Sequence, residues 1–157
     1  MRIDSLAIDD FKNLKNFEID IDETQLTSVF IGRNGAGKSN LLEAIVIIFR
    51  DLDLNMQTSE FSYEIRYKCS EHSIKIRSDH IKKSRIFEID NKQCTRTFFY
   101  KKRDQVLPAH VFAYYSGPSN RLEKYFIKHQ KKFYNALLAS VDKGIHNKTT
   151  KYGLPTY

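Results

Sequence analysis

The chain has 157 residues, enough for one domain with a hydrophobic core, and 41% of them are hydrophobic. No apolar run approaches the roughly 20 residues of a membrane-spanning helix, and the N-terminus lacks the pattern of a signal peptide. Cys69 and Cys94 do not have the spacing of a zinc site. These features argue against a membrane protein and predict a cytoplasmic location.

The net charge of +7 is distributed unevenly along the chain. Residues 1–60 carry 6 basic and 11 acidic side chains, a balance of −5, whereas residues 61–157 carry 20 basic and 8 acidic ones, a balance of +12. The clearest basic clusters are Lys82 to Arg85 and Lys101 to Arg103. Such clusters either bind nucleic acid or occupy solvated hairpin loops that keep strand edges from pairing.

The first two elements are predicted to be strands of a hairpin. Ile3 to Phe11 alternates imperfectly, which indicates a strand with a bulge, and Phe17 to Asp22 alternates cleanly. Lys12 to Asn16 lies between them as the turn.

A glycine-rich segment follows the hairpin. Gly32 to Ser39 reads G-R-N-G-A-G-K-S and matches the phosphate-binding P-loop pattern G-x-x-x-x-G-K-[ST] at every fixed position. In such a loop, backbone N–H groups surround the phosphates, the lysine adds charge and the Ser/Thr hydroxyl binds Mg²⁺. The predicted nucleotide-binding residues are Gly32, Asn34, Gly35, Ala36, Gly37, Lys38, Ser39 and Asn40, with Ser39 as the Mg²⁺ ligand.

The flanks of the loop suit this chemistry. Leu26 to Ile31 is predicted to be a buried strand, and the apolar residues from Leu41 to Phe49 recur at helical spacing. A helix that begins at Lys38 directs its unpaired N–H groups and positive dipole end at the same phosphates. The helix is expected to fade between Asp51 and Asn55.

Residues after Phe61 alternate with a period of two, which predicts an antiparallel meander over 61–68, 72–77, 85–90 and 93–100. The continuous apolar run within Val106 to Ser116 predicts a central strand that is buried on both faces. A long helix is then expected from Ser119 or Asn120 to Val141, with a basic face, and residues 143–157 are expected to be a flexible tail.

The predicted organisation is a lobe over residues 1–142, with the tail at 143–157. The lobe divides into a hairpin and P-loop unit (1–60), the meander (61–104) and a core strand with its helix (105–142). The fold class is α/β, of the P-loop NTPase type.

The first 50 residues resemble the start of SMC, RecF and OLD-type ATPases, which are ABC-type ATPase heads. In that family a hairpin ending in N-F-[RK]-[NS] precedes the P-loop and frames the adenine. Here Asp10-Phe11-Lys12-Asn13 corresponds to it, with Asp10 in place of the usual Asn. Lys12 and Asn13 are therefore implied nucleotide contacts, or polar residues of a hairpin turn. The segment from Val111 to Glu123 resembles AAA-annotated ATPases of bacterial restriction systems.

The resemblance implies ATP and Mg²⁺ as cofactors, DNA as a partner of the full-length protein, and a second head in a homodimer. It also implies ATP hydrolysis, yet the family's Walker B strand and L-S-G-G-[QE] loop are absent from this sequence. The nearest imitation of Walker B, Ile45 to Asp51, lies inside the predicted helix. No catalytic residue is predicted, and the chain is expected to be an incomplete head lobe, truncated before Walker B. Such a lobe lacks parallel neighbours for its P-loop strand, and its exposed apolar edges favour association.

Two other functions are compatible with the residues. One is a basic nucleic-acid-binding or decoy protein with a P-loop that is not used for hydrolysis. The other is a small-molecule kinase, for which the sequence contains no convincing acceptor site or lid arginines.

Overall fold

The computed structural model describes residues 1–25, 27–56, 59–111, 122, 125 and 127. The chain divides into two compact units, Met1–Tyr114 and Tyr115–Tyr157. Nearly all the described residues belong to the first unit, and the fold below is that of this unit.

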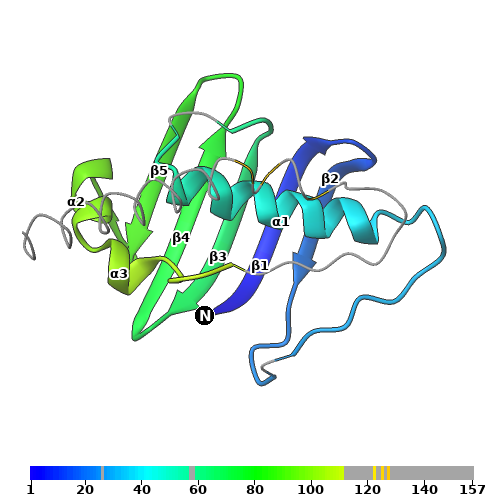
Figure 1. Cartoon of the computed structure of the whole chain (residues 1–157), viewed down its shortest axis with the longest axis horizontal. Helices are drawn as coiled ribbons and strands as arrows, with labels where there is room; N and C mark the ends of the chain where they lie inside the picture. Colours follow the sequence, from blue (N-terminus) through cyan, green and yellow to red (C-terminus); the bar gives the residue numbers. More distant parts are fainter. Residues whose placement is uncertain (26, 57–58, 112–121, 123–124, 126, 128–157) are drawn as a thin grey trace, which may run out of the picture. The chain divides into compact units, whose positions relative to one another are not determined.

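A six-stranded antiparallel sheet forms the framework, in the order β2-β1-β3-β4-β5-β6 (Figure 1). Its strands are β1 (Arg2–Phe11), β2 (Leu14–Asp20), β3 (Tyr63–Cys69), β4 (His72–Asp79), β5 (Ser84–Ile89) and β6 (Lys92–Cys94). The predicted meander is therefore confirmed for its first three strands, and the N-terminal hairpin joins it through pairing of β1 with β3.

One face of the sheet is apolar because the strands alternate in register. Leu6 pairs with Ile65, Ile65 with Ile76, and Ile76 with Phe87, so that a row of buried side chains crosses four strands. The predicted bulge in the first strand is confirmed, since the register shifts between Ile3 and Ser5.

Helix α1 (Lys38–Asp53) lies across this apolar face (Figure 1). It begins at Lys38, where the sequence predicts a helix to begin. Its apolar residues include Ile47, Ile48 and Leu52, which are fully buried, and Phe49 contacts Tyr67 of β3 edge to face, with the ring centroids 5.4 Å apart. The core therefore lies between α1 and the sheet.

The opposite face is polar, and Glu64 of β3 is at the centre of its ion pairs. The Glu64 carboxylate accepts hydrogen bonds from Arg66 and Arg77, and Lys75 Nζ lies 3.7 Å from it. Cross-strand pairs of opposite charge of this kind stabilise a solvent-facing sheet surface.

The turn of the first hairpin is tighter than predicted. Only Lys12 and Asn13 separate the strands, because Leu14 is buried and pairs with Phe11. Leu14 has two polar residues on each side, so the sequence does not show that the second strand already begins there.

The prediction of a strand over Gln93 to Tyr100 is wrong beyond Cys94. Helix α2 (Arg96–Lys101) follows β6, and the short helix α3 (Arg103–Val106) follows α2. Thr95 caps α2 by accepting a hydrogen bond from the Phe98 N–H through its hydroxyl, at 3.2 Å. The helix turns Phe99 into the core against Phe87, with ring centroids 4.5 Å apart.

Two further predicted strands are corrected. Residues 27–31 are not in a strand, and Val29 and Ile31 are 77% and 91% exposed. A strand at this position requires a hydrogen-bonding neighbour, and the described sheet supplies none. Val106 belongs to α3 and residues 107–111 form no strand, while residues 112–116 lie outside the described residues. The predicted long helix and tail also lie outside them, apart from residues 122, 125 and 127. Within the described part of the chain, no helix is long and apolar enough to cross a membrane.

Candidate functional site

The glycine-rich segment forms an exposed loop that leads into α1. Residues 32–36 are exposed and residues 37–40 are half-buried. Gly35 and Gly37 have φ angles of 85° and 101°, in the left-handed region that other residues rarely adopt. The Ala36 N–H donates to the Arg33 carbonyl at 3.1 Å, which tightens the turn.

The N-terminus of α1 is open to an anion. Gly37 is its N-cap, no side chain caps it, and its first turn contains no acidic residue. The first N–H groups of a helix have no partner within the helix, and the helix dipole makes this end positive. The arrangement therefore suits phosphate chemically.

Lys38 closes the loop onto itself. Its Nζ donates to the Gly32 carbonyl at 2.6 Å and to the Arg33 carbonyl at 2.9 Å. The ammonium group is thus held beside the first two residues of the loop. Its positive charge adds to that of the helix N-terminus.

The turn of the β1–β2 hairpin packs against the loop. Asn13 Nδ2 donates to the Gly35 carbonyl at 2.9 Å, and Asn13 Oδ1 accepts a hydrogen bond from Asn40 Nδ2. The backbone angle of Gly37 favours glycine, and a Cβ atom there would lie 2.9 Å from Leu14 Cδ2, so that the buried Leu14 side chain would have to shift. Asn13 therefore joins the middle of the loop to the first turn of α1.

Lys12 is paired with a buried carboxylate. Its Nζ lies 2.5 Å from Oε2 of Glu43, whose side chain is fully buried within α1. A buried carboxylate requires such a partner. The sequence does not reveal this role of Glu43, because a glutamate in a helix usually faces solvent. The apolar residues on both sides of Glu43 are the one signal in the sequence that could have indicated its burial.

Ser39 is the second residue of α1, and Asp51 lies twelve residues further along the same helix. At 1.5 Å per residue, this places the two about 18 Å apart along the axis. Asp51 is thus unable to share a metal ion with Ser39, which agrees with the expectation that Ile45 to Asp51 is helix and not Walker B. The described residues contain no group of three or more His, Cys, Asp or Glu side chains that could hold a metal ion by themselves.

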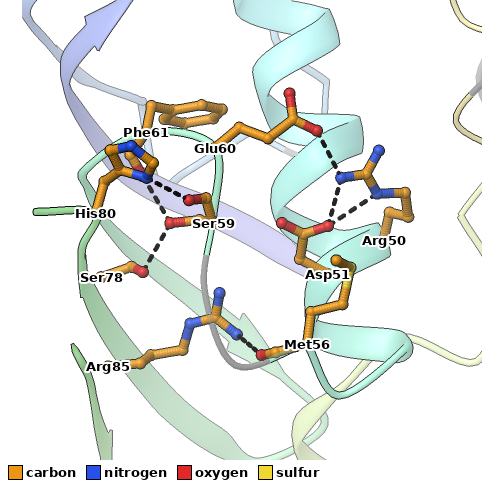
Figure 2. Close-up of polar contacts among 9 residues, drawn as sticks. All are labelled: Arg50, Asp51, Met56, Ser59, Glu60, Phe61, Ser78, His80 and Arg85. Carbon is orange, nitrogen blue, oxygen red and sulfur yellow. Dashed lines mark hydrogen bonds and ion pairs between the residues drawn. The ribbon is translucent and has the colours of Figure 1, made fainter. Parts of the chain in front are cut away.

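A second polar cluster surrounds the C-terminal end of α1 (Figure 2). Arg50 donates to Asp51 Oδ1 through Nε and Nη2, at 2.8 and 2.6 Å, and Nη2 also donates to Glu60 at 2.9 Å. Burial raises the pKa of Asp51, and the hydrogen bonds from Arg50 offset only part of that effect. This cluster fixes the end of the helix against the segment that leads into β3.

The sequence-predicted residues are thus brought together in part. Gly32 to Asn40 form one loop and helix start, and Asn13 contacts it directly, while Lys12 reaches the helix at Glu43. Asn34 and Ala36 lie on the exposed part of the loop.

Comparison with known proteins shows the family to which the chain belongs. Residues 1–155 match the family described as AAA ATPase domain. The chain is 44% identical over 48 residues to the DNA replication and repair protein RecF of Lactobacillus acidophilus, and 44% identical over 45 residues to that of Rickettsia canadensis. These stretches cover 31% and 29% of this chain but 12% of each relative, so the chain matches only a small part of the length of these relatives. The matches confirm the RecF-like resemblance, and the chain belongs to the AAA ATPase domain family.

Proposed function

We propose that this chain is the Mg²⁺-ATP-binding lobe of a DNA-associated, ABC-type ATPase. The observation that carries the proposal is the N-terminus of α1, where left-handed Gly37 leaves the helix end uncapped beside Lys38. In this proposal the backbone N–H groups of residues 35–39 surround the phosphates, Lys38 neutralises the β- and γ-phosphates, and Ser39 holds Mg²⁺.

Lys12 and Asn13 have a positioning role in this proposal in addition to any contact with the nucleotide. Their bonds to Glu43, Gly35 and Asn40 hold the hairpin against the loop. The bound nucleotide would lie beside the hairpin turn.

Hydrolysis in this proposal depends on residues that this sequence does not contain. A Walker B carboxylate and a catalytic base are needed to hold Mg²⁺ and orient the attacking water. Pairing with a second head, and work in bacterial DNA repair or defence, are part of the same proposal. The support for a DNA partner is the similarity to proteins named for DNA replication and repair.

The test is binding of a fluorescent ATP analogue with and without Mg²⁺. We expect Lys38→Ala to weaken binding at least about tenfold, since charge-assisted contacts to phosphate contribute about 1.5–3 kcal/mol. Ser39→Ala should remove the Mg²⁺ dependence. Lys15→Ala removes an exposed charge from β2 and serves as the control. Equal affinity of the native chain and Lys38→Ala would refute the proposal.

A further inference from the structure

A basic cavity lies at the other end of α1 from the glycine-rich loop. It has a volume of about 150 Å³ and is lined by Met56, Lys83, Arg85, Phe87 and Arg96. A single water molecule needs roughly 10–15 Å³ by the same measure, so the cavity has room for a small polyatomic ion. Its lining includes three cations and no carboxylate.

The three cations come from one hairpin and from the helix that follows the sheet. Lys83 lies in the β4–β5 turn, Arg85 lies at the start of β5, and Arg96 begins α2. Lys83 and Arg85 belong to the basic cluster already evident in the sequence, and the fold adds Arg96 to it.

Neutral groups hold the two arginines in place. Arg85 Nη1 donates to the Met56 carbonyl at 2.9 Å (Figure 2), and Arg96 Nε donates to Asn55 Oδ1 at 2.8 Å. Both bonds go to neutral oxygen atoms of residues just past the C-terminal end of α1. They therefore leave the positive charges of Arg85 and Arg96 without a counter-charge.

The charge in the cavity is not paired. Among the described residues, none of the three cations lies within ion-pair distance of a carboxylate, whereas Arg50, Arg77 and Arg103 each do. Asp51 interacts electrostatically with Arg85, but its ion pair is with Arg50. Nε and Nη2 of Arg85 are buried, and Arg85 interacts electrostatically with Tyr63 and Tyr100 as well as with Asp51, so these two donors do not line the cavity. The cavity itself is lined by cations and by no acidic side chain.

We propose that this cavity binds one phosphate group. Two planar guanidinium groups and an ammonium group offer donors in several directions, which suits the tetrahedral oxygens of a phosphate group, whether a diester or free, better than a planar carboxylate. The phosphate is either free or part of a nucleic acid backbone. The site is separate from the glycine-rich loop and does not depend on nucleotide binding there.

The test is calorimetric titration of the full chain with inorganic phosphate, at an ionic strength held constant with chloride. The titration uses the Lys38→Ala background, so that the glycine-rich loop contributes little. We expect Lys83→Gln and Arg96→Gln each to weaken phosphate binding at least about tenfold. Lys68→Gln removes an exposed charge from β3 and should leave the affinity unchanged.

A second arm identifies the source of the phosphate. If Lys83→Gln and Arg96→Gln also weaken binding of a short DNA duplex, and each lowers the salt-dependence slope by about 0.9, the ligand is backbone phosphate. If duplex binding does not change, the ligand is free phosphate. The proposal is overturned if the Lys38→Ala chain binds no phosphate, or if Lys83→Gln and Arg96→Gln behave as Lys68→Gln does. Lys83 is exposed in a turn, so its substitution tests the site without loss of fold, and circular dichroism checks this.

Discussion

Gly35 and Gly37 both have left-handed backbone angles, but their surroundings differ. A Cβ atom on Gly35 would meet nothing within 4 Å, whereas one on Gly37 would lie 2.9 Å from Leu14 Cδ2 and 3.2 Å from Asn13 Oδ1. A side chain at Gly37 would thus adopt a strained φ angle and would also displace the side chains of the hairpin packed against it.

We therefore expect Gly37→Ala to lower the free energy of unfolding by more than about 1–2 kcal/mol, the cost of left-handed backbone alone. Gly32→Ala is the matched control, because its Cβ would only touch Ala36 Cβ at 3.6 Å and Gly32 has no positive φ. Urea denaturation measures both. Equal stabilities of the two variants would contradict the assigned role of Gly37.

The loop itself could be read from the sequence because its pattern specifies backbone conformation directly. The P-loop pattern fixes glycine at 32 and 37, and position 37 is where the start of the helix needs a left-handed backbone. The partners of Lys12 and Asn13 could not be predicted, because contacts over 31 and 22 residues of chain depend on how the hairpin packs. Contacts of this range have no local sequence signal.

At the scale of the element, α2 shows how a period-two pattern can mislead. Phe98, Phe99 and Tyr100 suit a strand by propensity, and β6 leads directly into them. The Thr95 cap and the core space beside Phe87 favour a helix instead. Tertiary packing outweighed propensity here, as it often does in short elements.

Two adjacent residues of α2 test this. Phe99 is fully buried and Phe98 is 47% exposed. We expect Phe99→Ala to lower the free energy of unfolding by about 3–5 kcal/mol and Phe98→Ala by less than about 1 kcal/mol. A strand would also bury one of these two adjacent side chains and expose the other, so stability alone does not distinguish a helix from a strand. The circular dichroism spectrum of Phe98→Gly is therefore measured as well, and it should lose helix signal.

The polar face of the sheet predicts a dependence of stability on pH. Burial alone would raise the pKa of Glu64, but hydrogen bonds from Arg77 and Arg66 outweigh it and lower the pKa below 4.5. Around pH 4 the unfolded chain then binds more protons at this site than the folded chain, so stability increases with pH. The contribution of Glu64 is complete above pH 4.5 and is lost as the pH falls through its folded-state pKa.

Glu64→Gln should accordingly flatten the acid limb of a plot of unfolding free energy against pH, between about pH 5 and 3. Glu71→Gln, which removes an exposed carboxylate from the β3–β4 turn, is the comparison. A slope unchanged by Glu64→Gln would show that the ion pairs around Glu64 add nothing to stability.

At the scale of the whole molecule, the exposed apolar residues before the glycine-rich loop stand out. Val29 and Ile31 are 77% and 91% exposed, in a segment whose sequence is typical of a buried strand. The apolar sequence of this segment predicts a strand that packs between neighbouring strands, but the described sheet contains no strand that pairs with it. The predicted domain boundaries at 60, 104 and 142 stay predictions.

These two residues should make the chain self-associate. We expect light scattering at tens of micromolar to decrease in the double variant Val29→Thr and Ile31→Thr, because the apolar surface available for contact is removed. Ile81→Thr changes an equally exposed residue at the β4–β5 turn and should have little effect. If Ile81→Thr reduced scattering as much, association would be a general surface property and not a property of this segment.

The closed position of Lys38 has a consequence for energetics. Its ammonium group already has two carbonyl ligands, at 2.6 and 2.9 Å, before any phosphate arrives. Phosphate binding is then a ligand exchange at Lys38, and the contribution of Lys38 to the affinity reflects only the difference between phosphate oxygens and peptide oxygens as acceptors. The carbonyl groups of Gly32 and Arg33 compete with the phosphate for the ammonium group of Lys38. The apparent dissociation constant for phosphate is therefore the intrinsic one divided by the fraction of molecules in which Lys38 is released from these carbonyls.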